Sequence, residues 1–354
     1  MPVLRIAPAH RRRYSRGVSL PDLASPDRYL FGFEGDTAVL LDMDRDAYRR
    51  SIFLDDRISA AQAQPAFAAV ADLVAPSPAP VAGWIFHVAH CGSTLLARAL
   101  DRPHGGLVLR EPLALRHLAA EAANAAAGDA GWRARLHLVT ALLARRYAGA
   151  PATIIKANVP VNFVLPALMT ANPAAPAIVL YFPLADYLAA VLRSEGHRNW
   201  VRRVTTELAP AIAVLAGPLP ASDAERAASL WLAQLRGFAT ALSHFRNVYS
   251  LDAERLFMTP TPVISAAAAL FDQALPDAEA AAIASGPLFN TYAKNPAAAF
   301  DNAARLARRA ATAKTLAPEI GAARGWVEAR LSQYPLPPRL DRPLPGTVAR
   351  DLLA

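Results

Sequence analysis

Hydrophobic residues gather in five short runs along the middle of the chain, at 84–89, 107–109, 153–156, 177–181 and 248–251. Runs this short, without polar alternation, are typical of strands that are buried on both faces of a sheet. The longer segments between them place apolar residues at helical spacing. Strands that alternate with helices predict a parallel sheet covered by helices, so the fold class is α/β.

The first part of the chain has a different pattern. Residues 28–54 alternate apolar and polar positions around the turn Glu34-Gly35-Asp36, which predicts a β-hairpin that continues through 51–54. An alanine-rich helix is expected around 60–74, and the proline-rich stretch 76–80 predicts a stiff linker. We therefore divide the chain into a small N-terminal β-rich element with its linker (1–80), a main α/β domain (81–334) and a proline-rich tail (335–354).

A long helical insertion, 199–245, is predicted between the fourth and fifth strands. Ser222 and Glu225 form a capping-box pair at the start of its second helix. Large apolar side chains then follow at helical spacing, which indicates core packing rather than a ligand site. These side chains are Trp231, Leu235, Phe238, Leu242 and Phe245. The remainder up to residue 331 is predicted to be helical.

The most informative segment joins the first of the five strands to the helix that follows it. Its residues are His90-Cys91-Gly92-Ser93-Thr94. A strand, a tight turn and a helix in this order aim backbone N–H groups and two hydroxyls at one point, at the positive end of the helix. We expect a phosphate or sulfate to bind there. The segment has no lysine and one glycine, so it is neither a Walker A loop nor a dinucleotide fingerprint.

Charge narrows the class of ligand. Lys and Arg number 37 against 29 Asp and Glu, and the formal net charge is +8. Lysine occurs only as Lys156, Lys294 and Lys314, so the positive charge is mostly arginine. A basic surface favours an anionic ligand. The arginines are scattered along helical segments without an aromatic platform, so nucleic acid is not an expected partner.

The single cysteine, Cys91, leaves no internal disulfide and suits a reducing compartment. No apolar run reaches the roughly 18–20 residues that a membrane span needs. The segment from Met1 to Arg16 is basic but lacks the apolar core of a secretory signal. The sequence therefore predicts a cytoplasmic protein without a membrane span.

The loop after the first strand resembles the phosphosulfate-binding loop of sulfotransferases. In that family the strand is followed by Pro-Lys/Arg-Ser-Gly-Thr/Ser-Thr and then by a helix. His90 falls at the family's basic position and Cys91 at its serine, whereas Gly92, Ser93 and Thr94 match directly. The resemblance implies a P-loop NTPase-like fold for the main domain.

Further segments resemble the family in the same order along the chain. They are Leu109-Arg110-Glu111-Pro112, Thr153-Ile154-Ile155-Lys156-Ala157-Asn158, residues 177–194, Tyr249-Ser250-Leu251-Asp252-Ala253-Glu254-Arg255-Leu256 and Leu270-Phe271-Asp272-Gln273-Ala274-Leu275. The resemblance thus spans residues 83–275. It implies an enzyme that moves a sulfuryl group from the co-substrate 3′-phosphoadenylyl sulfate to a hydroxyl or amine on a small-molecule or peptide acceptor.

The resemblance also implies roles for individual residues. Glu111 becomes the general base, although a carboxylate there also suits the start of a helix. His90 and Lys156 become the cations around the transferring group and the leaving phosphate. Arg98 either pairs with a nearby acid or faces the ligand, and His87 is interpreted as a core histidine. The scheme requires no metal, and no His/Cys cluster has ligand spacing.

The chain departs from the family where the 3′-phosphate binds. The family's arginine and serine at that site correspond to Phe182 and Ala190. Arg193 and Ser194, about one helical turn further on, are expected to substitute, as is Lys294 in a later loop. Two other classes stay open on this account. One is an atypical P-loop kinase or phosphotransferase, and the other is a non-catalytic nucleotide-binding protein on the same fold.

Overall fold

Five parallel strands form the central sheet within residues 23–122 and 129–354, the parts of the chain that the computed structural model describes. In spatial order they are β5 (Val108–Arg110), β6 (Ile154–Lys156), β4 (Gly83–His87), β7 (Ala177–Tyr181) and β8 (Val248–Asp252). Each strand lies at one of the five apolar runs and pairs in parallel with its neighbours, so the predicted parallel sheet is confirmed. Almost every strand residue is buried, which explains the lack of polar alternation.

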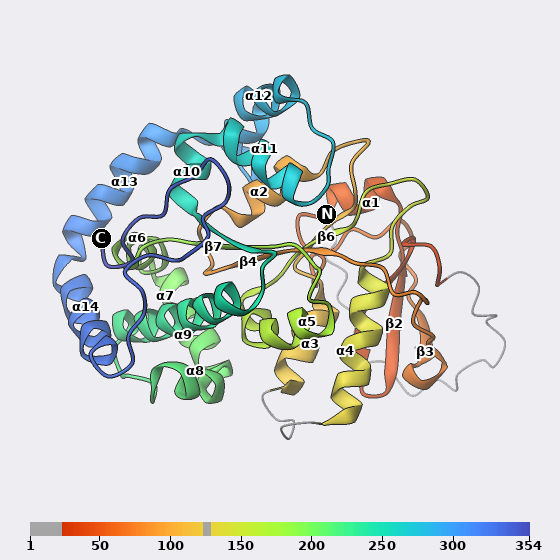
Figure 1. The fold of residues 1–354 in the computed structure, drawn as a ribbon, viewed down its shortest axis with the longest axis horizontal. Coiled ribbons are helices and arrows are strands. Elements are labelled where there is room, and N and C mark those ends of the chain that lie inside the picture. Colours follow the sequence, from red (N-terminus) through yellow and green to blue (C-terminus); the bar gives the residue numbers. More distant parts are fainter. Residues whose placement is uncertain (1–22, 123–128) are drawn as a thin grey trace.

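Helices cover both faces of this sheet (Figure 1). One face carries α2 (Ser93–Leu100), α10 (Ala253–Met258) and α11 (Pro260–Leu270), and the opposite face carries α5 (Leu165–Ala171) and α9 (Asp223–His244). The other helices described are α1 (Arg45–Arg50), α3 (Leu113–Ala122), α4 (Ala130–Leu143), α6 (Leu184–Val191), α7 (Glu195–Glu207), α8 (Ala209–Ala216), α12 (Asp277–Ser285), α13 (Asn302–Thr315) and α14 (Ala317–Leu331). The architecture is therefore α/β.

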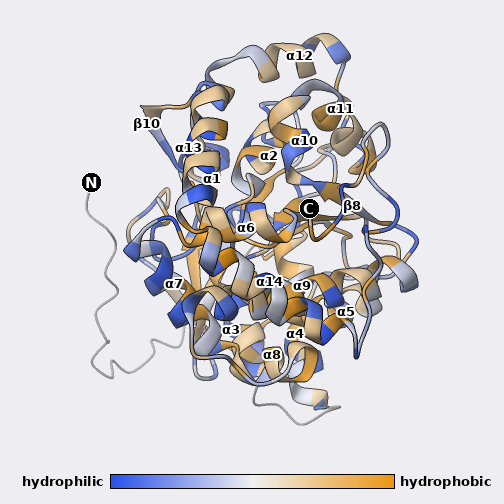
Figure 2. Ribbon diagram, turned by 90° about the vertical axis from the view of Figure 1, so that its left-hand side faces the viewer, coloured by the Kyte–Doolittle hydropathy of each residue, from blue (hydrophilic) through white to orange (hydrophobic). Residues whose placement is uncertain are grey.

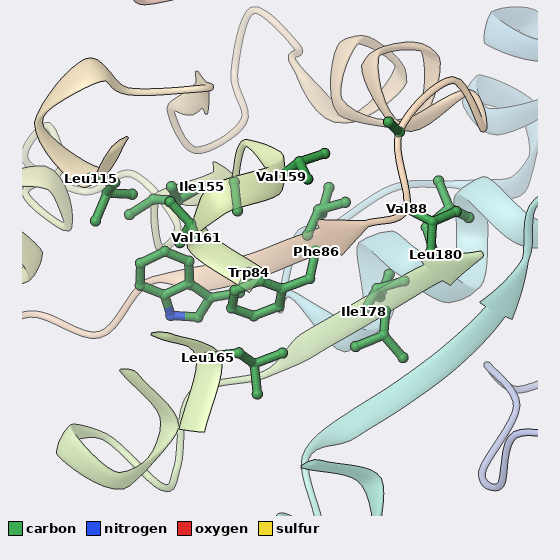
Figure 3. Packing of buried hydrophobic residues seen from close by; sticks show 14 of the residues in the cluster. Trp84, Phe86, Val88, Leu115, Ile155, Val159, Val161, Leu165, Ile178 and Leu180 are labelled. Carbon is green, nitrogen blue, oxygen red and sulfur yellow. The ribbon is translucent and has the colours of Figure 1, made fainter. Parts of the chain in front are cut away.

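The central strand β4 shows how the buried runs form the core. Trp84 and Phe86 lie two residues apart, so their side chains emerge on the same face of the sheet. Their rings stack with centres 5.6 Å apart, and Val161 and Leu165 lie next to Trp84 (Figure 3). With β6 on one side and β7 on the other, β4 has no free edge, and its position relative to both neighbours is set by backbone hydrogen bonds.

The N-terminal element is a separate antiparallel sheet of β1 (Arg28–Glu34), β2 (Thr37–Asp42) and β3 (Ala66–Ala69). The predicted hairpin is confirmed for β1 and β2, but its continuation through 51–54 is wrong because that segment is not a strand. The alanine-rich helix around 60–74 is also wrong. The open edge of β2 offers backbone hydrogen-bonding partners to Ala66–Ala69, and this pairing outweighs the intrinsic helix propensity of alanine, which is high but is readily overridden by tertiary context.

Three helices, α7, α8 and α9, lie between β7 and β8, so the helix that begins after Ser222 is the third of this region and not the second. The helix α7 presents a mostly hydrophilic surface (Figure 2). At the start of α9 the Ser222 hydroxyl oxygen accepts a hydrogen bond from the Glu225 N–H, which confirms the capping pair. The apolar stripe is buried, except that Phe245 at the helix end is partly exposed.

The C-terminal part is mainly helical but contains a hairpin that the sequence did not predict. Its strands β9 (Thr291–Tyr292) and β10 (Asn295–Ala299) are antiparallel. Beyond α14 the proline-rich tail packs along β8, where Ser250 N–H donates to Arg342 O and Leu344 N–H donates to Ser250 O. Leu340 and Leu344 of the tail are buried. Among the described residues, every helix is too short or too polar to span a bilayer.

A buried arginine fixes the N-terminal element against the main sheet. Arg110, the last residue of β5, is 1% exposed and pairs with the Asp101 carboxylate at 2.5 Å. Its guanidinium also donates to the carbonyl oxygens of Tyr48 and Ser51, each at 2.6 Å, and of Ile52 at 3.2 Å. These carbonyls lie at and beyond the end of α1, where helix carbonyls lack partners within the helix. One side chain thereby holds residues 48–52 beside the carboxyl end of the sheet.

We predict that Arg110→Met lowers the free energy of unfolding by about 3–5 kcal/mol, because it leaves Asp101 and several carbonyls without their partner in a buried place. Urea denaturation measures the loss. Arg133→Met, on the exposed side of α4, is the matched control and is expected to change stability by less than about 0.5 kcal/mol. A loss in Arg110→Met no larger than the loss in this control would show that Arg110 does not anchor the element.

Candidate functional site

The loop between β4 and α2 has the backbone of an anion-binding turn. Ala89, His90 and Gly92 have positive φ angles of 72°, 50° and 84°, and Gly92 is the N-cap of α2. A Cβ atom on Gly92 would lie 2.7 Å from the Phe257 ring. Glycine is therefore required twice, by the left-handed backbone and by the close approach of the ring. The loop directs the first N–H groups of α2 toward the space in front of it.

Thr94 gives an independent sign that this space holds a ligand. The residue is 2% exposed, and its hydroxyl oxygen has no hydrogen-bonding partner among the described residues. A buried hydroxyl without a partner costs roughly 1–3 kcal/mol. Thr94 and its neighbour Ser93 both line the adjoining cavity. A polar ligand at the helix start would satisfy the Thr94 hydroxyl.

The cavity in front of the loop has a volume of about 800 Å³. Its walls come from the loop, the end of α6, the β9–β10 hairpin and one side of α13. These elements are distant in sequence. The cavity that they form lies at the carboxyl end of the parallel sheet, where the loop follows the central strand β4. Ligands of open α/β sheets bind in this place, where strand connections run to opposite sides.

Cations dominate the cavity wall. The lining includes Arg193, Lys294, Arg305, Arg308 and Arg309, whereas no lining residue is a carboxylate. Just behind the wall, the Glu254 carboxylate pairs with Arg305 and with Arg309, each at 2.6 Å. Three cations are then left without a carboxylate partner among the residues described, namely Arg193, Lys294 and Arg308. The cavity suits a ligand with several negative charges.

One wall is aromatic. The ring centres of Phe257 and Phe300 are 6.1 Å apart, and those of Phe300 and Tyr292 are 5.4 Å apart. The Arg305 guanidinium lies 4.1 Å from the centre of the Phe257 ring, on its face. Flat apolar surfaces beside cations suit a ligand that combines a planar ring with phosphate or sulfate groups. A nucleotide has this chemistry.

A second group of polar side chains lies at the ends of neighbouring strands. Glu111 follows β5, Lys156 ends β6 and His87 ends β4, and the carboxyl ends of parallel strands meet at one edge of the sheet. The Lys156 ammonium is fully buried and pairs with Glu111 Oε1 at 2.5 Å. Burial would raise the pKa of Glu111, but the ammonium groups of Lys156 and Lys294 outweigh burial and lower it. Glu111 is therefore a carboxylate at neutral pH.

His87 is neutral and structural, in agreement with its interpretation as a core histidine. Its Nδ1 accepts a hydrogen bond from the Ala89 N–H at 3.0 Å, so the ring proton is on Nε2. Nε2 donates to the Ala157 carbonyl at 2.9 Å. Burial, followed by the charge of Lys156, lowers the pKa of His87 well below its usual value. The ring links the anion loop to the segment after β6.

His90 lines the cavity as predicted, but it does not carry the charge of the family's lysine or arginine. Its ring centre lies 4.8 Å from that of His197 and 5.2 Å from that of Trp200. Burial lowers the pKa of His90 well below its usual value, and nearby Lys294 lowers it further. At neutral pH the loop therefore offers amides and hydroxyls, and its histidine is uncharged.

Three residues that were predicted to bind the co-substrate lie off the cavity. Cys91 points into the core, and burial raises the pKa of its thiol to about 12. Arg98 donates to the Ala293 carbonyl at 2.9 Å and so supports the β9–β10 hairpin. Ser194 is the N-cap of α7, where its oxygen accepts from the His197 N–H. These placements correct the prediction, because each side chain has a structural partner instead.

Several cavity residues were not found from the sequence. The arginines of α13, Arg305, Arg308 and Arg309, are spaced to lie on one side of a helix, and that spacing was the available signal. Phe257 and Phe300 carried no signal, since they meet only when α10 and the segment before α13 pack together.

Comparisons of the chain with family models, with curated proteins and with solved structures found no match. The fold and the site together define an α/β protein with a cationic cavity at the carboxyl end of its parallel sheet. Within the residues described, no group of three or more His, Cys, Asp or Glu side chains is arranged to hold a metal ion.

We predict that Gly92→Ala weakens the binding of pyrophosphate, used as a simple polyanion, by about tenfold or more, because the new Cβ displaces Phe257 and the loop. Isothermal titration calorimetry measures the affinity. Gly149→Ala is the matched control, since Gly149 has a φ angle of 71° with no atom near the added Cβ. Both variants are expected to lose about 1–2 kcal/mol of stability through backbone strain. Equal pyrophosphate affinities in the two variants would show that the loop does not take part in binding.

We predict that the free energy of unfolding falls as pH is lowered from 7 to 5. The unfolded chain protonates its imidazoles at a pKa of about 6.5, whereas the pKa values of His87, His90, His117 and His197 are lowered in the folded chain. The unfolded state thus binds more protons in this window, so stability rises with pH.

His87→Gln is expected to reduce that slope by up to about 1.4 kcal/mol per pH unit. Urea denaturation at several pH values measures it, with His104→Gln on an exposed turn as the control. If the free energy of unfolding of His87→Gln depends on pH as steeply as that of the wild type, His87 is not a buried neutral ring in the folded chain.

Proposed function

We propose that the protein is a sulfotransferase-like enzyme on a P-loop NTPase-like fold. It would move a sulfuryl group from 3′-phosphoadenylyl sulfate to a hydroxyl or amine of a small-molecule or peptide acceptor. The observation that carries the proposal is that the anion loop and the Glu111–Lys156 pair lie at the same end of the sheet. The charge of Lys294 lowers the pKa of His90 in the loop and also that of Glu111. The order of the sulfotransferase-like segments along the chain supports it.

The reaction needs a base for the acceptor and fixed positive charge for the transferring group. A lone pair of the acceptor oxygen or nitrogen attacks sulfur and forms the new bond. The bond from sulfur to the bridging phosphate oxygen breaks, and its electron pair stays on the leaving adenosine 3′,5′-bisphosphate. The acceptor proton passes to the Glu111 carboxylate, which its neighbouring cations keep ionised.

Donors around the transferring group come from the loop and from β6. The N–H groups at the start of α2 and the hydroxyls of Ser93 and Thr94 are fixed before the donor arrives, so they stabilise charge without reorganising. Lys156 adds a buried positive charge behind Glu111. No step of this scheme requires a metal ion.

The donor's 3′-phosphate needs cations other than those of the family. Phe182 and Ala190, which stand at the family's arginine and serine positions, line the cavity and offer no charge. We assign the 3′-phosphate to Arg193 and Arg308, which line the same cavity. The Arg193 guanidinium donates to His197, and the Arg308 guanidinium donates to the Tyr292 hydroxyl at 2.8 Å. We also propose that the reaction takes place in the cytoplasm, because the only cysteine, Cys91, is a free thiol and a reducing compartment keeps thiols free.

Parallel calorimetric titrations with adenosine 3′,5′-bisphosphate, AMP and ATP test the function. We expect the bisphosphate to bind about tenfold to a hundredfold more tightly than AMP, as loss of one charged hydrogen-bond partner costs about 1.5–3 kcal/mol. Arg193→Ala should remove most of this preference. Arg203→Ala, on the exposed side of α7, is the control and should keep it.

Equal affinities of the wild-type chain for the bisphosphate and AMP would show that the 3′-phosphate is not read. Tight, Mg²⁺-dependent binding of ATP would instead favour a phosphotransferase, because phosphoryl transfer from ATP normally uses the metal to neutralise charge. Binding of the bisphosphate without sulfuryl transfer to any acceptor would favour a nucleotide-binding protein.

A further inference from the structure

Lys294 lies closer to the reacting end of the site than its sequence context suggested. It stands in the turn between β9 and β10 and lines the cavity together with Gly92, Ser93 and Thr94. Its ammonium nitrogen is 5.7 Å from the centre of the Phe53 ring, in the N-terminal element. The Lys156 ammonium nitrogen is 5.9 Å from the centre of the same ring. Two lysines from distant segments therefore converge on one buried aromatic side chain.

The charge of Lys294 acts on one group in the loop and on another at the strand ends. After burial, Lys294 has the largest effect on the pKa of His90 in the loop. It also lowers the pKa of Glu111, second only to Lys156 among the charges that act on that carboxylate. A charge that acts on both His90 and Glu111 also acts on a group that moves from a donor at the loop to an acceptor beside Glu111.

The loop itself brings no cation to this position. His90 stands where sulfotransferases have lysine or arginine, and its ring is neutral at neutral pH. Amides and hydroxyls alone leave the charge on a sulfuryl group only partly balanced. A cation from another element is needed, and Lys294 lines the cavity together with the loop residues Gly92, Ser93 and Thr94 and forms no ion pair with a described carboxylate.

We propose that Lys294 supplies the cation that the loop lacks and binds the transferring sulfuryl group rather than the 3′-phosphate. The role rests on the proposed function. The turn that carries Lys294 is held by Arg98, whose guanidinium donates to the carbonyl of the preceding residue, Ala293. Phe53 offers its ring to the ammonium as a cation–π partner. Arg98 and Phe53 are thus positioning residues.

Binding of two ligands that differ only in the sulfuryl group tests this role without any acceptor. The ligands are 3′-phosphoadenylyl sulfate and adenosine 3′,5′-bisphosphate, titrated by calorimetry into the full chain. Lys294→Met keeps the length of the side chain and removes its charge. We expect Lys294→Met to weaken the binding of 3′-phosphoadenylyl sulfate by about tenfold or more and the binding of the bisphosphate by less than about threefold.

Three further variants complete the test. Lys294→Arg should restore most of the preference for the donor, because it restores the charge. Arg98→Met should lose part of the same preference through the displaced turn, and Arg98→Lys should regain it. Lys314→Met, an exposed lysine on α13 outside the cavity, is the matched control and should bind both ligands as the wild type does.

The outcomes separate this role from the function on which it rests. If the wild-type chain binds neither ligand, the proposed function falls and the role of Lys294 falls with it. If the wild-type chain binds both and Lys294→Met weakens them equally, Lys294 holds the nucleotide, and only its proposed role is overturned. Unchanged affinities in Lys294→Met overturn that role as well. Lys294 is exposed on the hairpin, so Lys294→Met is expected to fold as the wild-type chain does, and circular dichroism checks this.

Discussion

The structure around the site depends on one buried ammonium group, that of Lys156. Its side chain has no exposed surface at the end of a strand inside the sheet. A buried charge without a counter-charge costs several kcal/mol, so this strand end requires an acid beside it. Glu111 meets the requirement from the next strand, and its φ angle of 58° turns the chain toward α3. The same cation disfavours protonation of His87, whose neutral ring then accepts from the anion loop.

The positive charges of the site fall into two groups with different partners. On α13, Arg305 and Arg309 share the carboxylate of Glu254, so their charge is largely used in holding that helix against α10. Arg193 and Arg308 face the cavity with neutral hydrogen-bonding partners instead, and Lys294 faces it without an ion pair to a described carboxylate. The number of basic residues in the sequence does not show which cations belong to which group. The difference depends on which carboxylates lie behind each guanidinium or ammonium in the folded chain.

Local pattern was enough to predict most of the fold. Buried strands, the hairpin of β1 and β2 and the cap at Ser222 each depend on neighbours in sequence, and all were found. The errors have a common cause in long-range pairing. Residues 66–69 form a strand because β2 has an open edge, and 291–299 form a hairpin supported by Arg98. Within the candidate site, the loop from His90 to Thr94 is continuous in sequence and was visible there. The arginines of α13 reach this cavity, and Phe53 reaches Lys294, only because distant elements pack together, and local sequence pattern does not report such packing.

The tail that lies along β8 links the rim of the sheet to the cavity. Its Arg350 pairs with Asp252 at the end of β8 and with Asp186 on α6. Asp252 also caps α10, the helix that carries Phe257 to the cavity wall and Glu254 just behind that wall. The tail therefore does two things with one segment. It covers backbone groups that would otherwise invite another strand, and it holds the start of α10 in place. A partner or protease that lifted this segment would loosen the aromatic wall from a distance, without touching any residue that lines the cavity.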